Sequence, residues 1–342
     1  MKAVVFHEHG GADVLRYEER PDPHIRAHEV LVEVRACALN HLDVWARGGL
    51  RGIEIGLPHI LGNDIAGVVR EVGEVVDWVQ PGDEVLLQPG VSCGHCFECL
   101  SGRDNLCPAY DILGYRRDGG YAELVSAPAV NVVPKPTGLS FEEAAALPLV
   151  TVTAWHMLVT RAQLQPGEDV LIHAAGSGVG SIGIQIAKLR GARVIATAGS
   201  DEKLAKAREL GADEVVNYTR ADWTKEVRRL TGRKGCEVVF EHTGAETWPG
   251  SIQSLAKNGR LVTCGATSGY DASTDLRQIF YRHVSLLGSF MGSKAELLEA
   301  LKFVERGQIR PVIDRTLPLE EARRAHELMQ DRAQFGKLVL VP

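Results

Sequence analysis

The most chemically distinctive part of the sequence is a group of four cysteines in one short segment. Cys93, Cys96, Cys99 and Cys107 fall within residues 93–107, among glycines and other turn-forming residues. Thiolates at this spacing bind zinc tetrahedrally, and four of them leave no coordination position for water or a substrate. The spacing therefore predicts one structural zinc ion. Two disulfides or free thiols are the alternatives, and His95 inside the segment is expected to be a loop residue rather than a ligand.

A glycine-rich loop is the second feature that could do chemistry. The apolar run 170–174 leads into Ala175-Gly-Ser-Gly-Val-Gly180, and a helical pattern follows. Small residues let the backbone approach a pyrophosphate, and a helix N-terminus supplies amide donors and positive potential. A G-x-G-x-x-G pattern is weak evidence alone, but its place between a strand and a helix makes it specific. The expected cofactor-binding residues of this loop are Gly176, Ser177, Gly178, Val179 and Gly180.

The end of the next strand bears on which nicotinamide cofactor is bound. NAD sites place Asp or Glu about 20 residues past the loop, where the carboxylate binds the ribose 2′-hydroxyl. Here the strand 193–198 ends without an acid, and Ser200 and Lys203 follow. A hydroxyl and an ammonium group without a carboxylate suit a 2′-phosphate, so we expect NADP. Asp201 favours the alternative, NAD, and a solvated surface lysine is an equally good interpretation of Lys203.

Two kinds of domain are needed to position these features. The first third of the chain alternates apolar and polar residues in short segments separated by glycine turns, which predicts a β-rich, barrel-like domain. From about residue 151, strands alternate with helices, which predicts a parallel, doubly wound sheet. Its expected strands are 170–174, 193–198, 214–217, 237–241, 260–264 and 284–289, and its expected helices are 179–189, 202–210, 221–230 and 248–255. Helices at 294–306 and 319–330 and a strand at 337–341 are expected in the tail.

Length and composition exclude several classes of protein. The 342 residues favour two domains, and 45% hydrophobic with 24% charged residues is ordinary for a globular chain. The net charge of −6 gives no basic surplus for nucleic acid or an anionic membrane. We find no apolar run of about 18 residues and no secretory signal at the N-terminus, so a cytoplasmic protein without a membrane partner is expected.

The order of these features resembles the zinc-containing alcohol dehydrogenases, within the medium-chain dehydrogenase/reductase superfamily, over essentially the whole chain. Gly62-Asn63-Asp64-x-x-Gly67 stands where that family writes Gly-His-Glu-x-x-Gly, and the segment 171–188 resembles the quinone oxidoreductase signature, with Ser177 replacing one glycine. The resemblance implies a GroES-like catalytic domain of residues 1–150 and 289–342, carrying the cysteine lobe 93–107. It also implies a Rossmann domain of residues 151–288.

The ligands of the family's catalytic zinc are replaced in this sequence. Asn40 stands at the catalytic cysteine position, Asn63 at the histidine position, Asp64 at the adjacent glutamate and Leu149 at the later cysteine. An amide is a poor zinc ligand and leucine is none, so we expect no catalytic zinc. Rebuilding of a metal site from Cys37, His41 and His59 is the weaker interpretation.

Without a metal, hydrogen-bond donors must polarise a substrate carbonyl. The resemblance to quinone oxidoreductase-like members, which keep an asparagine at this position, assigns the donor role to Asn40 and Asn63. The sequence leaves Asp64 open between a catalytic and a structural role, and Asp43 is expected to be structural. The alternative interpretation of Asn40 is a structural one, in which it caps a turn. By resemblance, the remaining cofactor-binding residues are His41, Thr153, Gly265, Ala266, Thr267, Phe290 and Met291.

The sequence thus predicts an NAD(P)-dependent oxidoreductase that carries a structural zinc. The enzyme is expected to reduce quinones or α,β-unsaturated carbonyls. A zinc-type alcohol dehydrogenase is the first alternative, and a non-enzymatic nucleotide-binding or redox-sensing protein is the second. The family resemblance suggests a homodimer or homotetramer, with 284–287 as a sheet edge that could pair across a two-fold axis. The remaining cysteines, Cys37, Cys236 and Cys264, are expected to be buried small apolar residues.

Overall fold

The computed structural model describes residues 1–50 and 52–342, which form two compact units. The first unit comprises Met1–Val150, Ser293–Glu305 and Pro311–Pro342, and the second comprises Thr151–Gly292 and Arg306–Arg310. The structure thus divides the chain after Val150, as the sequence suggested. It places the second division at Ser293 rather than at 289, and it returns Arg306–Arg310 to the second unit.

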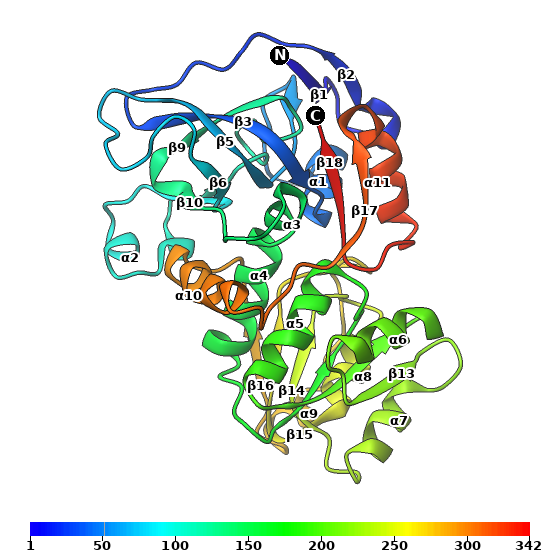
Figure 1. The fold of residues 1–342 in the computed structure, drawn as a ribbon. Helices are drawn as coiled ribbons and strands as arrows, with labels where there is room; N and C mark the ends of the chain where they lie inside the picture. The colour runs from blue at the N-terminus through cyan, green and yellow to red at the C-terminus, as the bar shows by residue number, and fades with distance from the viewer. Residues whose placement is uncertain (51) are drawn as a thin grey trace. The chain divides into compact units, whose positions relative to one another are not determined.

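The first unit is built on a seven-stranded sheet in the order β10-β6-β5-β3-β18-β17, with β9 paired to β3. β3 (Glu29–Ala38) lies between β5 (Asp64–Val72) and β18 (Lys337–Val341), and it is antiparallel to both (Figure 1). Ala38 pairs with Asp64 on one side and with Val339 on the other. The C-terminal strand therefore brings its residues to the end of β3, close to the segment that carries Asn40.

Shorter elements complete this unit. The other strands are β1 (Lys2–Phe6), β2 (Arg16–Glu19), β4 (His59–Ile60), β6 (Glu84–Leu87), β7 (Gly90–Val91), β8 (Asp111–Ile112), β9 (Leu124–Pro128), β10 (Val132–Pro134) and β17 (Ile313–Pro318). The helices are α1 (His41–Gly48), α2 (Phe97–Leu100), α3 (Phe141–Ala145), α10 (Lys294–Glu305) and α11 (Ala322–Gln330). The expected helix 319–330 begins as a 3-10 turn, Leu319–Glu321, directly after Pro318.

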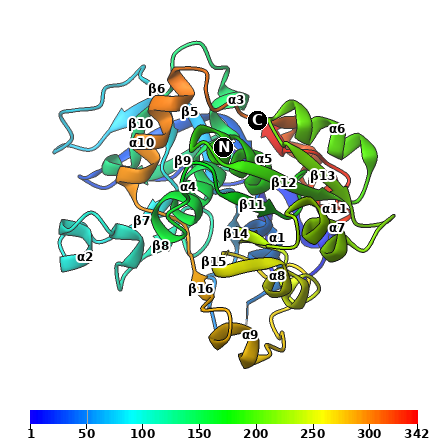
Figure 2. The ribbon, with the colours of Figure 1, turned by 90° about the horizontal axis from the view of Figure 1, so that it is seen from below.

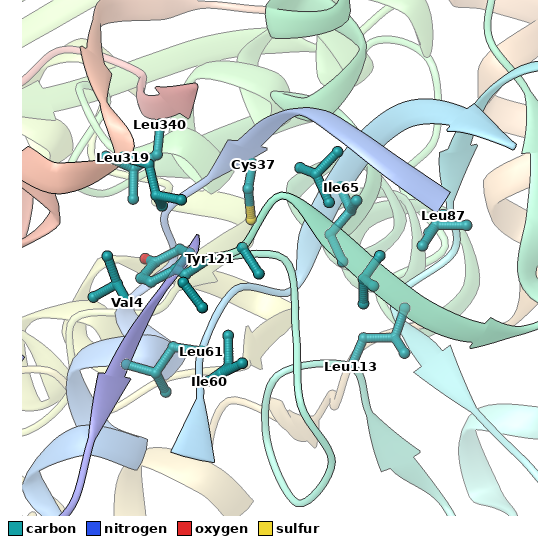
Figure 3. Close-up of a cluster of buried hydrophobic side chains, with 14 of the residues drawn as sticks. Val4, Cys37, Ile60, Leu61, Ile65, Leu87, Leu113, Tyr121, Leu319 and Leu340 are labelled. Carbon is teal, nitrogen blue, oxygen red and sulfur yellow. The ribbon is translucent and has the colours of Figure 1, made fainter. Parts of the chain in front are cut away.

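Apolar side chains from distant parts of the sequence form the core of the first unit. Figure 3 shows Val4, Cys37, Ile65 and Leu340 converging with others on one buried cluster. Gly62 lies against this cluster with φ +105°, and a Cβ there would come within 2.7 Å of the Cys37 sulfur. Only glycine can therefore place the following Asn63 and Asp64 at this point.

The second unit is a sheet of six parallel strands in the order β13-β12-β11-β14-β15-β16. Its strands are β11 (Asp169–Ile172), β12 (Arg193–Ala198), β13 (Glu214–Asn217), β14 (Cys236–Glu241), β15 (Leu255–Thr263) and β16 (Ser285–Gly288). Its helices are α5 (Gly178–Leu189), α6 (Asp201–Glu209), α7 (Trp223–Leu230), α8 (Trp248–Ser254) and α9 (Leu276–Phe280). The strand order reverses at β11 and β14, which lie side by side in Figure 2, and sheets of this kind bind ligands at the carboxyl end of that switch point.

Two boundaries in the second unit differ from the expected ones for local reasons. β15 starts at Leu255 rather than at 260, because a register shift in β14 lets Leu255 pair with Cys236. α7 starts at Trp223 rather than at 221, because the Asp222 side chain accepts the N–H groups of Thr224 and Lys225 and caps the helix there.

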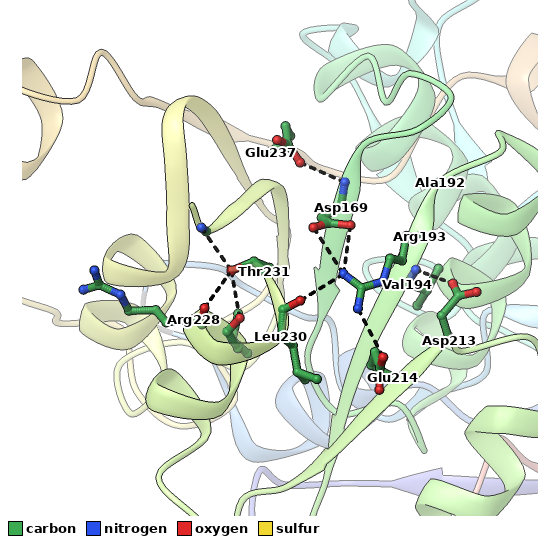
Figure 4. A network of polar contacts seen from close by, with 12 residues as sticks. Asp169, Ala192, Arg193, Val194, Asp213, Glu214, Arg228, Leu230, Thr231 and Glu237 are labelled. Atoms are coloured by element: carbon green, nitrogen blue, oxygen red, sulfur yellow. Dashed lines mark hydrogen bonds and ion pairs between the residues drawn. The ribbon is translucent and has the colours of Figure 1, made fainter. Parts of the chain in front are cut away.

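Charged side chains tie the amino ends of the strands together. The Arg193 guanidinium contacts Asp169 at 3.5 Å, Glu214 at 3.2 Å and the Leu230 carbonyl at 3.2 Å (Figure 4). One side chain at the start of β12 thus joins β11, β13 and the end of α7. These ion pairs are at the edge opposite the carboxyl ends, where a ligand is expected.

The sequence also predicts that Pro148 interrupts the helical segment 141–158, and this interruption is confirmed. α3 ends at Ala145, α4 (Pro148–Trp155) begins at the proline, and a π-helical turn, His156–Arg161, follows. By length and composition alone, the combined stretch Phe141–Arg161 is the one part of the described chain apolar enough to cross a membrane. Most of its apolar window, 78%, is buried inside the protein, as in the core helix of a folded domain.

Candidate functional site

The four cysteines of the lobe are brought together in the first unit. They lie between β7 and β8, with Cys96 as the N-cap of α2 and Cys99 within it. All four sulfur atoms lie within 4.8 Å of one another, and Cys99 is 3.9 Å from Cys93 and 3.5 Å from Cys96. Four sulfurs bound to zinc at about 2.3 Å would stand about 3.8 Å apart, so the set fits a zinc ion.

Of the two alternatives for these cysteines, all of which lie in the described chain, free thiols stay open and disulfides are not formed. All seven cysteines are free, so the disulfide interpretation does not apply to this conformation. Within residues 1–50 and 52–342, the four-cysteine group is the one gathering of His, Cys, Asp and Glu that could hold a metal. The described residues do not bring Cys37, His41 and His59 together as such a group.

A second cluster forms where the end of β3 meets β5 and β18. The Lys337 ammonium group is buried and donates to the Leu39 carbonyl at 2.6 Å, to Asn40 Oδ1 at 2.6 Å and to Asp64 Oδ2 at 2.9 Å. Asn40 Nδ2 donates to the same Asp64 oxygen at 2.9 Å. Asp64 Oδ1 accepts the backbone N–H of Leu149 at 2.7 Å. All three ammonium hydrogens and both carboxylate oxygens are thus bonded, as a buried ion pair requires.

This cluster decides how Asn40 and Asp64 can act. Asn40 was expected to direct a free amide at a substrate, but Asp64 binds its nitrogen and Lys337 binds its oxygen. The donor role expected for Asn40 therefore falls to the second hydrogen of Nδ2, which remains for a ligand. Asp64, left open by the sequence, is a buried anion paired with Lys337.

The Asn63 amide is likewise held by the protein at one end. Its Nδ2 donates to the Leu113 carbonyl at 2.6 Å, which fixes the orientation of the amide. Its Oδ1 is buried and has no hydrogen-bond partner in the described chain. Asn63 therefore presents a buried acceptor, and one Nδ2 hydrogen remains beside the bond to Leu113.

The structural role expected for Asp43 is confirmed. Its carboxylate accepts the backbone N–H groups of Asn40 at 2.7 Å and Gly62 at 3.1 Å. Burial raises the pKa of Asp43 to about 7, although these backbone donors oppose the shift. Asn40 also begins α1 as its N-cap residue, so the turn-capping interpretation of its backbone is correct as well.

A chain of hydrogen bonds joins α1 to α11. Arg47 contacts His326 Nδ1 at 2.9 Å, and His326 Nε2 lies 3.2 Å from the Tyr121 hydroxyl. Arginine can only donate, so Nδ1 accepts and the Nε2 hydrogen points at Tyr121. Burial lowers the pKa of His326 to about 3, and the ring is therefore neutral near pH 7. The chain ties the last turn of α1, which holds Arg47, to α11.

The glycine-rich loop of the second unit lies at the carboxyl end of β11. Ser177 is the N-cap of α5, and its hydroxyl oxygen accepts the Gly180 N–H at 2.9 Å. A Cβ on Gly180 would lie 2.5 Å from the Ala174 carbonyl oxygen, so the helix packs on the strand too closely for any side chain there. Gly176, Ser177, Gly178, Val179 and Gly180 thus form the turn and first residues of a long helix, which is the arrangement that binds a pyrophosphate.

Polar groups gather at the tip of β12. Ser200 caps α6, its hydroxyl accepting the Lys203 N–H at 3.3 Å. The Asp201 carboxylate is held by Asn217 Nδ2 at 2.6 Å and by an ion pair with Arg220. The acid that favoured NAD is therefore partly neutralised. Sequence reasoning missed Arg220, although a basic residue shortly after the third strand was a visible signal.

The other predicted cofactor residues fall into several settings. Thr153 is buried in α4, Gly265-Ala266-Thr267 follow the end of β15, and Phe290 is exposed while Met291 is buried beyond β16. His41, in the first unit, opens α1 with its ring 6.0 Å from that of Trp45.

Cys37 and Cys236 are buried as expected, but Cys264 lies one residue past β15 and is partly exposed.

Comparison with known proteins places these features in a family. Residues 26–137 match the alcohol dehydrogenase GroES-like domain, and residues 178–306 match the zinc-binding dehydrogenase domain. A zinc-type alcohol dehydrogenase-like protein of Schizosaccharomyces pombe is 34% identical over 99% of both chains, and a quinone oxidoreductase of Salmonella typhimurium is 31% identical over 99% of both. A solved NAD-dependent alcohol dehydrogenase is 53% identical over the full length of both chains, with a TM-score of 0.97.

Removing the buried ammonium should destabilise the first unit. We expect Lys337→Met to lower the unfolding free energy by about 3–5 kcal/mol, because Asp64 would stay buried without its counter-ion. Urea unfolding of the variant and the wild type measures this. The matched control is Lys188→Met, which removes a lysine bonded to Asp213 at 2.8 Å on the surface and should cost about 1 kcal/mol or less. Equal losses in the two variants would contradict the role given to Lys337.

Proposed function

The chain belongs to the zinc-binding, alcohol dehydrogenase-like branch of the medium-chain dehydrogenase/reductase superfamily, and we propose that it reduces quinones or α,β-unsaturated carbonyls without a catalytic zinc. Membership makes it a nicotinamide-dependent oxidoreductase. The observation that carries the proposal is the buried cluster of Lys337, Asn40 and Asp64. Asn40 and Asp64 stand where the family's catalytic zinc ligand and adjacent glutamate are expected.

The donor set of this cluster does not suit a second zinc ion. The Asn40 oxygen and one Asp64 oxygen already accept hydrogen bonds from an ammonium group, and Leu149 contributes no ligand atom. A zinc ion placed there would meet the Lys337 charge at close range. An amide is also a weaker zinc ligand than the cysteine and histidine that Asn40 and Asn63 replace.

The remaining residues act by binding and orienting. A bound nicotinamide cofactor supplies the hydride. The first turn of α5 and the loop before it bind the pyrophosphate through backbone N–H groups. Lys337 and Asp64 fix both ends of the Asn40 amide, so that its second N–H is preorganised to donate to the oxygen that gains negative charge.

We predict that Asn40→Ala lowers kcat and kcat/KM together, by roughly 10²-fold, because the lost donor acts mainly in the transition state. Steady-state kinetics with a quinone or an enone, paired with thermal unfolding, tests this. Asn131→Ala is the control, since Asn131 is a buried asparagine that donates to the Gln88 and Gly90 carbonyls away from the cluster. Loss of stability without loss of rate in Asn40→Ala would leave only the capping role.

The alcohol dehydrogenase alternative is favoured by the names of the relatives, including the solved structure that is 53% identical. Strong chelation separates the two functions. Under the proposed function, quinone or enone reduction survives chelation until the cysteine lobe loosens. Oxidation of simple alcohols that is abolished by chelation before any unfolding would overturn the metal-free mechanism.

We also propose one structural zinc, bound by Cys93, Cys96, Cys99 and Cys107. Protein purified without added zinc should contain about one zinc per chain by elemental analysis. Cys96→Ser should lose the zinc and lower the unfolding temperature more than it lowers kcat, because a structural site contributes to folding. Cys264→Ser, outside the lobe, should keep the metal. A stoichiometry near two would be incompatible with a single site.

For the cofactor we propose NADP over NAD, because Asp201 is engaged by Arg220 and Asn217 while Ser200 and Lys203 stand at the same tip. Lys203→Ala should raise the KM for NADPH several-fold more than the KM for NADH, because only NADPH carries the 2′-phosphate. Lys206→Ala is the control on the same helix, where Lys206 pairs with Glu202. A higher kcat/KM with NADH, unchanged in Lys203→Ala, would establish NAD instead.

A homodimer or homotetramer remains our proposal for the assembly. β16 is an edge strand of its sheet, and the nearby side chains of Leu276, Phe280 and Tyr281 are exposed. An unpaired edge beside apolar side chains favours pairing with a second copy. Light scattering on the purified protein counts the chains per particle, and a monomer would exclude the proposal.

A further inference from the structure

A buried polar network occupies the switch point of the parallel sheet, beneath the loops that follow β11 and β14. Its members are His173, directly after β11; Glu241, the last residue of β14; and Ser251, in α8. All three side chains are buried. Ser251 Oγ lies 2.5 Å from Glu241 Oε2 and 2.9 Å from His173 Nε2, and His173 Nδ1 lies 3.2 Å from the Thr197 hydroxyl.

We propose that this network is a positioning device for the dinucleotide: it holds the loops after β11, β12 and β14 in the form that binds the cofactor. His173, Ser251 and Glu241 are positioning residues that touch the loops and not the reacting atoms. The proposal rests on the nicotinamide cofactor binding at the glycine-rich loop.

The direction of each hydrogen bond follows from the chemistry of the groups. Burial opposes ionisation of Glu241, but the His173 ring and donors from Ser251, Thr243 and Gly244 hold its pKa below the usual value. An ionised carboxylate only accepts, so Ser251 donates its hydroxyl hydrogen to Glu241. The Ser251 oxygen must then accept from His173 Nε2–H. Burial lowers the pKa of His173 to about 4, so the ring is neutral near pH 7 and Nδ1 accepts the Thr197 hydroxyl hydrogen.

Glu241 fixes the conformation of the loop after β14 by accepting hydrogen bonds from its backbone. Its Oε1 accepts the backbone N–H groups of Thr243 at 2.7 Å and Gly244 at 3.1 Å, and the Thr247 hydroxyl donates to it as well. With Ser251, these donors fill the carboxylate's acceptor sites. Thr243 in turn accepts the Ser268 N–H at 2.7 Å through its carbonyl oxygen. The loop after β14 is thereby tied to the segment after β15, which contains the predicted cofactor residues Gly265-Ala266-Thr267.

The other end of the network reaches the glycine-rich loop. The His173 carbonyl accepts from His242 Nε2 at 2.9 Å, and two residues later the Ala175 N–H donates to the Thr197 carbonyl at 2.9 Å. The backbone on both sides of His173 is thus fixed just before Gly176. Loss of a hydrogen bond within the network should make this loop more mobile. Cofactor binding would then have to order the loop, and the free-energy cost of that ordering would weaken binding.

Two serines of α8 give a matched pair of variants. Ser251 and Ser254 are both fully buried, but the Ser254 hydroxyl has no hydrogen-bond partner in the described chain. We expect Ser251→Ala to raise the Kd of the dinucleotide, titrated directly by its fluorescence, about fivefold or more. KM for the dinucleotide should rise with it, while kcat at saturating cofactor stays within about twofold of the wild type. Ser254→Ala should change neither Kd nor kcat.

Thr197→Val is the second variant, because it keeps the shape of the side chain and removes only the hydroxyl at the far end of the network. It should weaken binding in the same direction, and it carries the test if Ser251→Ala does not fold. Wild-type affinity in both variants, or equal losses in Ser251→Ala and Ser254→Ala, would overturn the proposal. Failure of the wild type to bind either NADH or NADPH would instead refute the proposed function on which it rests.

Discussion

The ion pair between Lys337 and Asp64 is the constraint on which the candidate site of the first unit depends. It joins residues 273 positions apart in the sequence, and it lies where the C-terminal strand β18 meets β3. A buried ammonium group is tolerable only when each of its hydrogens has an acceptor, and here Leu39, Asn40 and Asp64 provide three. The same bonds that satisfy the lysine fix the orientation of the Asn40 amide.

That arrangement gives the site a fixed positive charge that belongs to the protein. In family members with a catalytic metal, a cation polarises the substrate oxygen directly. Here the cation is covalently part of β18 and is already paired, so it orients a neutral donor rather than acting as a Lewis acid. Under the proposed function, the negative charge of the substrate is spread over a conjugated system, and a single preorganised hydrogen bond contributes to stabilising it.

Two buried carboxylates, one in each unit, are stabilised by different means. Asp64 has a cation beside it, whereas Glu241 has a neutral histidine and a ring of N–H and O–H donors. Hydrogen bonds alone can stabilise a buried carboxylate when enough of them converge on it. In a parallel sheet, the strand ends and helix starts gather at one edge, so the donors are available there without a basic residue. The network of the second unit therefore orders backbone loops. In the first unit, the ion pair of Lys337 and Asp64 instead orients the Asn40 side chain.

The sequence by itself determined the features that depend on neighbouring residues. The cysteine spacing, the glycine-rich loop between a strand and a helix, the break at Pro148 and the turn-capping by Asn40 all act within short segments, and each could be predicted from local chemistry. Tertiary structure decided which polar groups meet across long separations. Lys337 stood out only as a lone charge in an apolar strand, and nothing nearby in the sequence pointed to Asn40 or Asp64 as its partners. Asn40 and Asn63 were assigned donor roles from their positions alone, but strand pairing and the Leu113 carbonyl determined which of their atoms remain available. His173, Glu241 and Ser251 gave no spacing signal, because the register of parallel strands, and not their order in the chain, brings strand ends together.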